Sequence, residues 1–341
     1  RHSFYHDSGL GLFYSGLTDK KNSMTMMQIV MINFAVIAIQ WACLATAGRM
    51  KMFPTMVFVF CWSTVVYDPV VYWVWSSNGW LHNMSVLDYA GGSVVHVSAG
   101  VAALVLAIKV GKRQDFDQVP LVNHSPPWIY IGTALLWFGW MGFNAGSASS
   151  ANERAVSARG LKFSSIASVL ERLRTGYDYP WIRFVQPGFG IIYGLLAGVV
   201  CFYAARYLKK CRIDDTLDVT GVHGVGGALG MILTGIFAQY RVTSLDVSGV
   251  VTAGWVDQIW KQVPVQLAAI GAVGIWSATW SVIFISVMNQ FPSLRLRASP
   301  EAELRGLDDA EVGEWSSMYL LQSEEGGTVH PTHDLESLKS E

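Results

Sequence analysis

Long apolar stretches separated by short polar ones dominate the chain. A helix needs roughly 20 apolar residues to cross the hydrocarbon core of a bilayer. Seven stretches are long enough, and we expect each to form a transmembrane helix. They are residues 24–48, 53–75, 90–110, 128–151, 188–208, 219–239 and 263–291. An eighth apolar piece, residues 9–17, is too short to span and is typical of the end of a helix.

The composition supports a membrane protein. Hydrophobic residues make up 52% of the 341 residues and charged residues only 14%, against about 25% charged in soluble domains. This argues against a disordered chain and leaves a soluble all-α protein with very apolar helices as the alternative. With 24 basic and 25 acidic residues, nothing favours a nucleic-acid partner. The four cysteines form no C-x-x-C pair, so neither a disulfide framework nor a zinc site is indicated.

The distribution of Lys and Arg predicts the topology. Both residues mark cytoplasmic loops, and they follow the third, fifth and seventh apolar stretches, whereas residues 76–88 contain neither. We therefore expect the odd-numbered helices to end inside the cell. The predicted organisation is a membrane domain over residues 1–298 and a polar, acidic cytoplasmic tail over residues 299–341. Because the chain begins with Arg1 and has no evident signal peptide, we expect a fragment or a processed product.

Two regions conflict with this topology. Basic residues flank both ends of the first stretch, although a single span places its ends on opposite sides. The segment 152–187 should lie outside, yet it carries six Arg and Lys residues and is too long for an ordinary connection. A physical interpretation is that one span is absent near residues 41–48 and an even number near residues 155–180.

Two histidines lie within apolar stretches, where ionisable residues are costly and indicate function. His96 follows D-Y-A-G-G-S-V-V, and His223 follows L-D-V-T-G-V. Each comes about two turns after an aspartate, Asp88 or Asp218, in a glycine-rich frame. The similarity predicts a pseudo-symmetric pair of helices, as in transporters built from repeats. Two facing imidazoles could pass a proton in a pore; the alternatives are separate hydrogen bonds to backbone carbonyls, or a metal site, for which a third ligand is missing.

Three aspartates lie near or inside the apolar stretches, and each has a possible structural role. Asp88 stands before the third stretch, where it could attract a cation and also cap a helix that opens at Ala90. Asp218 has the same two readings, and we favour capping. Asp68 precedes Pro69 inside the second stretch, so we expect it to satisfy backbone groups that the proline leaves free.

Aromatic and hydroxyl side chains gather where the predicted helices end. Trp75 ends the second stretch, and Phe143 and Ser147 lie in W-F-G-W-M-G-F-N-A-G-S-A at the end of the fourth. Aromatic faces attract cations and a serine hydroxyl can accept a hydrogen bond, so these residues are candidates for an outer mouth. An interfacial aromatic belt is the alternative. Asn144, in the same motif, is expected to be structural.

Six sequence blocks resemble the ammonium transporter family (Amt/Mep/Rh), particularly its fungal members, and they occur in the family order. They are G-L-G-L-F-Y-S-G-L with K-K-N-S, V-Y-D-P-V-V-Y-W-V-W-S-S-N-G-W, D-Y-A-G-G-S-V-V-H, W-F-G-W-M-G-F-N-A-G-S-A, I-D-D-T-L-D-V-T-G-V-H-G-V-G-G and L-R-L-R-A-S.

The resemblance implies an all-α polytopic bundle in a trimer, with a pore in each subunit. Trp75 and Ser147 match positions that recruit ammonium at the outer vestibule, and Asp88 matches an acidic residue that acts through the field and structure of that site. Phe143 matches one of two gate phenylalanines. His96 and His223 match twin histidines that line a hydrophobic pore for ammonia.

The family has eleven spans, whereas about seven or eight are expected here. Parts of two spans look fused near Trp41, and polar sequence from Gly160 to Tyr179 replaces two others. We therefore expect a multi-pass plasma-membrane ammonium transporter without enzymatic activity or cofactor. The alternative is a non-conducting or regulatory form, either an inactive trimer subunit or an ammonium sensor.

Overall fold

The computed structural model describes residues 12, 15–18, 20–26, 43, 45–117, 125–146, 189–244 and 250–312. The predicted all-α fold is confirmed: the described elements are helical, and the β contact among them is an isolated bridge between Met50 and Arg297. The longer elements are α4 (Met52–Trp62), α5 (Asp68–Trp75), α7 (Ser98–Val110), α8 (Pro126–Gly146), α11 (Phe189–Lys210), α12 (Gly226–Phe237) and α14 (Gln262–Met288). The shorter ones are η1 (Lys20–Asn22), η3 (Ser63–Tyr67), α6 (Trp80–Asn83), η4 (Gly92–Val97), η6 (Thr220–Val225), α13 (Tyr240–Thr243), η7 (Trp255–Asp257), η8 (Pro292–Leu294), α15 (Pro300–Arg305) and η9 (Asp308–Val312).

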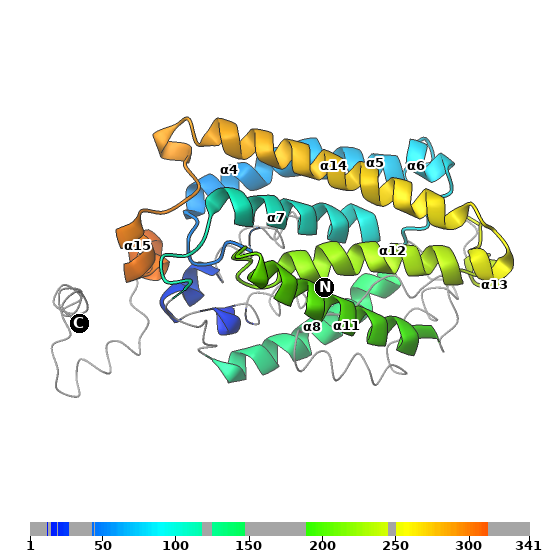
Figure 1. The fold of residues 1–341 in the computed structure, drawn as a ribbon, viewed down its shortest axis with the longest axis horizontal. Helices are drawn as coiled ribbons and strands as arrows, with labels where there is room; N and C mark the ends of the chain where they lie inside the picture. The colour runs from blue at the N-terminus through cyan, green and yellow to red at the C-terminus, as the bar shows by residue number, and fades with distance from the viewer. Residues whose placement is uncertain are drawn as a thin grey trace.

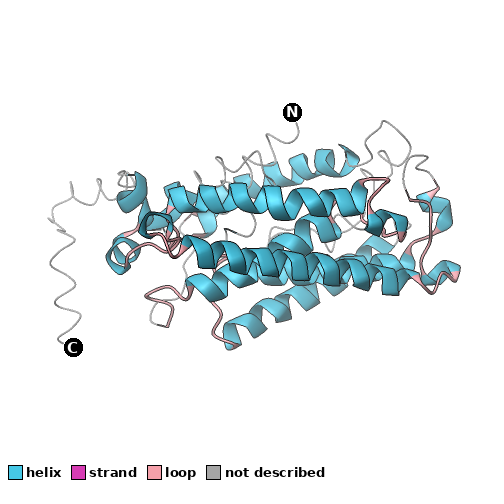
Figure 2. Cartoon of the chain, turned by 90° about the horizontal axis from the view of Figure 1, so that it is seen from above, coloured by secondary structure: helices cyan, strands magenta, loops and turns pink. Residues whose placement is uncertain are grey.

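The long helices lie side by side along the long axis of the molecule, with their connections at its two ends (Figures 1 and 2). As the sequence predicts, α7, α11 and α14 all end at the same end. We call this the basic end, because basic residues gather in its loops and in the last turn of α11. They are Arg49, Lys51, Lys112, Arg113, Lys209, Lys210, Arg212, Arg295 and Arg297. The opposite end contains residues 76–91 and 250–261.

A packed seam joins the continuous helix α4–η3–α5 to α14. Every fourth residue of the first helix is 0–2% exposed, and so is every fourth residue of α14. Side chains four apart lie on one face of a helix, so each helix buries one stripe. The indole Nε1 of Trp62 donates to Ser281 Oγ at 3.0 Å across the seam. The buried stripe of the first helix is Phe58, Trp62, Val66, Val70 and Val74, and that of α14 is Ala269, Val273, Ser277, Ser281 and Ile285. The α14 stripe also reaches α7, because Ser277 Oγ donates to the carbonyl of Ser98 at 2.7 Å.

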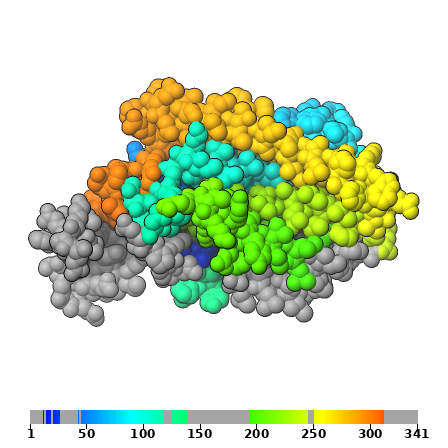
Figure 3. All heavy atoms as spheres, in the orientation of Figure 1, coloured from blue at the N-terminus to red at the C-terminus, as the bar shows by residue number. Residues whose placement is uncertain are grey.

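The outward faces are apolar too, which is typical of a lipid-facing surface. Phe60 on α4 is 71% exposed, Ile275 on α14 70% and Tyr203 on α11 66%. The helices α11 and α14 form much of the surface seen in Figure 3. Among the described residues, four stretches are long and apolar enough to cross a membrane. They are Met52–Asn83, Gly92–Val110, Thr220–Phe237 and Gln262–Met288.

The observed helices follow six of the seven predicted stretches closely, and the first differs. It was expected to run to Gly48, but residues 45–49 form turns. Gly48 has φ +79°, in the region that favours glycine, and Arg49 folds inward instead of continuing a helix. Residues 27–42 and the atypical polar segment near 155–180 lie outside the described residues.

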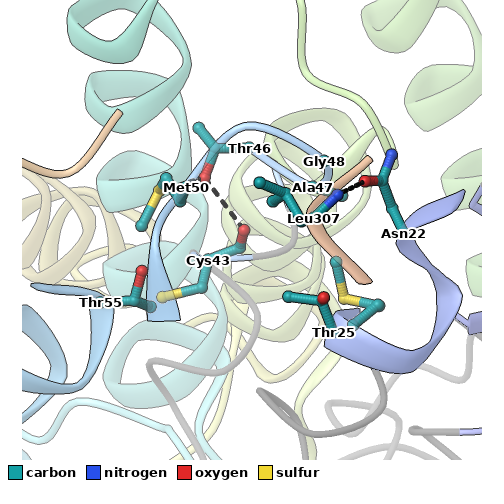
Figure 4. A pocket seen from close by; sticks show the side chains of 10 residues that line it. Asn22, Thr25, Cys43, Thr46, Ala47, Gly48, Met50, Thr55 and Leu307 are labelled. Carbon is teal, nitrogen blue, oxygen red and sulfur yellow. Dashed lines mark hydrogen bonds between the residues drawn. The ribbon is translucent and has the colours of Figure 1, made fainter. Parts of the chain in front are cut away.

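The first part of the tail packs against the basic end. Asp308 accepts the backbone N–H groups of Met24 and Thr25 at 2.9 and 2.7 Å. The Leu307 N–H donates to Asn22 Oδ1 at 2.9 Å beside a small cavity, where Leu307 faces the 43–50 turns (Figure 4). Glu303 is buried and pairs with Arg297 at 3.1 Å. Residues 295–312 therefore tie together loops that are far apart in the sequence.

Candidate functional site

The two predicted histidines occupy matching positions in the fold. His96 lies in η4 at the start of α7, and His223 lies in η6 at the start of α12. Both η4 and η6 are six-residue π-helical segments. Such wide turns are rare and occur frequently at functional sites. The matching frames that the sequence predicts are therefore real structural counterparts.

The two imidazoles meet at the centre of the bundle. Their Nδ1 atoms are 2.9 Å apart, and their ring planes are inclined by only 4°. The residues are 3% and 2% exposed. One Nδ1 donates while the other accepts, so the two rings adopt complementary tautomers. A proton that arrives on one ring therefore has a direct hydrogen bond to the other.

Glycines allow this close approach. A Cβ at Gly100, four residues after His96, would lie 2.1 Å from the backbone nitrogen of Gly224. A Cβ at Gly227, four residues after His223, would lie 2.9 Å from the Cβ of His96. The two helices thus cross at pseudo-equivalent glycines, and this crossing sets the distance between the rings.

Asp88 caps the histidine-bearing helix at the opposite end of the molecule. Its carboxylate accepts five hydrogen bonds of 2.6–3.1 Å, which come from four backbone N–H groups and the Ser93 hydroxyl. The predicted cap is confirmed, although the helix begins at Gly92 rather than Ala90. Gly91, with φ +94°, redirects the chain so that consecutive N–H groups converge on the carboxylate.

The predicted cap at Asp218 is wrong. Asp218 has φ +56° and pairs with Lys209 at 3.0 Å, with its side chain 35% exposed. Asp215 performs the capping instead, because its carboxylate accepts the N–H groups of Val219 and Thr220 at 3.0 and 2.6 Å. The spacing from Asp215 to His223 equals that from Asp88 to His96. This equal spacing in the sequence was the signal that would have identified the correct residue.

The predicted role of Asp68 is also wrong. Asp68 is exposed, and its carboxylate accepts no hydrogen bond from the part of the chain that the structure describes. Pro69 cannot donate to the carbonyl of Val65, four residues earlier. The indole Nε1 of Trp276 on α14 donates to that carbonyl at 3.1 Å. A distant helix therefore compensates for the proline.

The candidate mouth residues are only partly described. Trp75 is 39% exposed, and its Nε1 donates to the backbone carbonyl of Asp88 at 2.7 Å. This contact brings two of the predicted mouth residues together. Phe143 and Asn144 lie in the last turn of α8, where the side chains are outside the described part, and Ser147 lies outside it altogether.

A buried ionic cluster at the basic end was missed by sequence reasoning. The fully buried guanidinium of Arg49 donates to Asp214 Oδ2 at 3.1 Å and to Thr216 Oγ1 at 2.7 Å. Arg113 reaches the same carboxylate oxygen at 3.1 Å. Burial lowers the pKa of Arg49 to about 10, although Asp214 opposes this change. Burial also raises the pKa of the neighbouring Asp215 to about 6.

Comparison with known proteins places this arrangement in a family. The profile described as "Ammonium Transporter Family" matches residues 34–171 and 180–316, most of the chain. The chain belongs to the ammonium transporter family. The break between the two matches, at residues 172–179, falls inside the predicted atypical segment.

Fungal relatives support the assignment. Ammonium transporter 1 of Schizosaccharomyces pombe is 34% identical, over 93% of this chain and 80% of that protein. This alignment spans 399 positions, more than the 341 residues of the chain, so the relative carries residues that this chain lacks. Ammonium transporter MEP2 of Saccharomyces cerevisiae is 36% identical over 84% of this chain, which spans less than two thirds (64%) of that relative.

Solved structures agree with the observed fold. The crystal structure of Saccharomyces cerevisiae Mep2 matches with a TM-score of 0.76 and 30% identity, over 88% of this chain and 85% of that one. The structure of Candida albicans Mep2 matches with the same TM-score and 29% identity, over 88% and 84%. The helices described here are therefore arranged as in these two structures.

Proposed function

We propose that the protein is an ammonium transporter that conducts ammonia or ammonium between its own helices, past His96 and His223. The observation that carries the proposal is the 2.9 Å contact between two buried imidazoles, in a chain whose relatives are named ammonium transporters. The rings offer hydrogen-bonding nitrogens in an apolar interior, where an uncharged amine and its proton can travel separately. Transport, rather than an enzymatic reaction, fits this arrangement.

The residues at the opposite end supply recruitment in this proposal. Trp75 presents an aromatic face, which favours a cation, and its indole is fixed by Asp88. The Asp88 carboxylate already accepts five hydrogen bonds, so it contributes negative potential rather than a direct ligand. Ser147 would complete the recruitment site, and Phe143 would gate the entrance below it.

The proposed setting is a plasma membrane crossed by residues 1–298. The basic end would face the cytoplasm, because Lys and Arg concentrate on that side of membrane proteins, and the tail 299–341 would lie there as well. A homotrimer with one pore per subunit follows from the family. Asn144 has a structural role in this proposal.

The proposal is tested by reconstituting the full chain in proteoliposomes and recording the current after an ammonium pulse. The His96→Ala/His223→Ala variant should lose the current, since no paired imidazoles remain. His82→Ala removes a histidine from α6, away from the pair, and should leave the current unchanged. A current that persists in the double variant would contradict the twin-histidine pathway. No current from folded parent protein would instead favour a non-conducting or regulatory form.

A further inference from the structure

The loop that precedes Asp88 is held by a side chain from a distant helix. Gln266, on the second turn of α14, is 0% exposed. Its Oε1 accepts the N–H of Leu87 at 3.0 Å, and its Nε2 donates to the carbonyl of Leu87 at 2.8 Å. One side-chain amide thus pairs with both polar groups of a single backbone residue, as a neighbouring strand would. Leu87 is fixed immediately before the carboxylate that caps α7.

The same amide also reaches the helix that follows His223. Gln266 Nε2 donates to the carbonyl of Met231 in α12 at 3.2 Å. Gly235, one turn further along α12, makes room for this side chain, because a Cβ there would lie 3.1 Å from Gln266 Cγ. Both amide hydrogens and the amide oxygen are therefore used. A flipped amide would place its oxygen against two carbonyls, so the orientation is fixed.

Met231 in turn lies against the segment that Asp88 caps. Its sulfur would lie 2.9 Å from a Cβ at Gly92, and the Gly92 N–H donates to Asp88 at 2.6 Å. Gln266 therefore sets the position of the Leu87–Asp88 segment relative to α12. Since Trp75 is itself bound to the carbonyl of Asp88, displacement of that segment would move both residues.

We propose that Gln266 is a positioning residue for ammonium recruitment, holding Asp88 and Trp75 in register with α12 through its three hydrogen bonds. This inference rests on the proposed function for its effect on transport. Gln266 acts through Leu87 and Met231, so its loss should weaken capture at the mouth and leave passage past the histidines intact.

Gln262 provides a matched control. It lies one turn before Gln266 on α14, is equally buried, and donates to the carbonyl of Ser85 at 2.9 Å in the same loop. Its Oε1 accepts from Thr252 at 3.5 Å. Gln262 thus resembles Gln266 in residue type, helix, burial and target loop, but its bonds reach neither Leu87 nor α12.

The first measurement does not depend on transport. Amide hydrogen exchange of residues 86–94 is compared by mass spectrometry in the parent, Gln266→Met and Gln262→Met. Loss of the Gln266 amide should speed exchange in this segment by about 10-fold, the effect of removing one or two hydrogen bonds. Gln262→Met should leave it unchanged. Equal exchange in parent and Gln266→Met would overturn the proposal, even in a chain that conducts nothing.

The second measurement separates positioning from general damage. In proteoliposomes, Gln266→Met should raise the ammonium concentration at half-maximal current by about 10-fold and change the maximal current by less than about twofold. A lower maximal current with unchanged half-saturation would contradict the inference. Gly235→Ala provides a second route if Gln266→Met does not fold, because its Cβ would lie 3.1 Å from Gln266 Cγ and 3.0 Å from Val263 Cγ2, so these side chains must shift while the amide is kept. It should change half-saturation and exchange in the same direction by a smaller factor, and a change in the opposite direction would overturn the proposal.

Discussion

The two histidine-bearing halves, one with His96 and one with His223, have the same local structure but different surroundings at their capped ends. In each, a carboxylate eight residues before the histidine caps a π-helical segment. Asp88 accepts five hydrogen bonds and stands beside the half-exposed Trp75. Asp215 accepts two backbone N–H groups and follows Asp214, which is held by Arg49 and Arg113. The common part places the imidazoles, while the differing parts lie at the two capped ends.

This difference agrees with the two roles that we propose for the ends. The Asp88 half presents an aromatic side chain and a carboxylate with five hydrogen bonds near the surface, as proposed for the capture of a cation. The Asp215 half lies beside loops that Arg49 and residues 295–312 hold together. A repeated element can therefore pair the two imidazoles, while each capped end takes its properties from the loops that pack there.

The largest effect is expected from removing the carboxylate of Asp88, which accepts more hydrogen bonds than that of Asp215. Asp88→Ala leaves four backbone N–H groups and a serine hydroxyl without their acceptor, and buried donors without partners each cost about 1–3 kcal/mol. We expect the ammonium current per folded protein to fall about 100-fold or more. Asp218→Asn is the control, since asparagine tolerates the φ of +56° at this position and the change removes only the pair with Lys209, so the current should change by less than about twofold. Similar losses in both variants would refute the distinction.

The second-largest effect is expected from disrupting the close contact between Gly100 and Gly224, where the two histidine-bearing helices cross. Gly100→Ala places a Cβ 2.1 Å from the backbone of Gly224, where neither helix can yield without separating. We expect about 2–3 kcal/mol lower stability and at least 10-fold less current, because the imidazoles move apart. Gly271→Ala on α14 meets nothing within 4 Å, so its melting temperature in detergent should match or exceed that of the parent. A parent-like Gly100→Ala variant would show that the crossing does not set the ring distance.

Substitutions in the Arg49 cluster test whether its ion pairs stabilise the Asp215 half. Arg49→Met leaves the buried Asp214 with one fewer cation, and breaking a buried ion pair costs about 3–5 kcal/mol. Thermal unfolding in detergent, with exchange of residues 211–225, should show this loss at the basic end. Arg212→Met removes a pair with Asp117 in which both side chains are about 60% exposed and should cost less than about 1 kcal/mol. Equal costs would mean that burial of the first pair has no energetic consequence.

The smallest effect concerns protonation of the Asp215 cap. Its pKa is raised from 3.8 to about 6, so the folded protein binds the proton more tightly than the unfolded chain. This stabilising contribution is complete below pH 3.8 and is lost as pH rises through 6. Relative to Asp215→Asn, the parent should gain about 1 kcal/mol between pH 7 and pH 5. Melting curves of both proteins at several pH values measure the gain, and a pH-independent difference would show that the carboxylate is not desolvated.

The hydrophobic pattern predicted most helix positions, since lipid and a packed interior both demand long apolar segments. Six predicted stretches agree with the observed helices, and residues 53–75 correspond to a continuous helix despite Pro69. The end of the first stretch could not be predicted from hydrophobicity, because the small residues 45–48 fit the end of an apolar helix as well as they fit a turn. Their conformation depends on Gly48 and on distant partners of Arg49, which hydrophobicity does not encode.

Composition, segment length and short motifs were enough to predict the membrane-spanning class, the family and the two histidines. They did not reveal which aspartate caps the second helix, which side chain satisfies the Val65 carbonyl, or which amide holds Leu87, because these depend on tertiary packing. Those choices join residues far apart in the chain, such as Gln266 and Leu87 or Trp276 and Val65. They depend on which backbone groups the packing leaves buried without partners, and that is fixed only once the helices have come together.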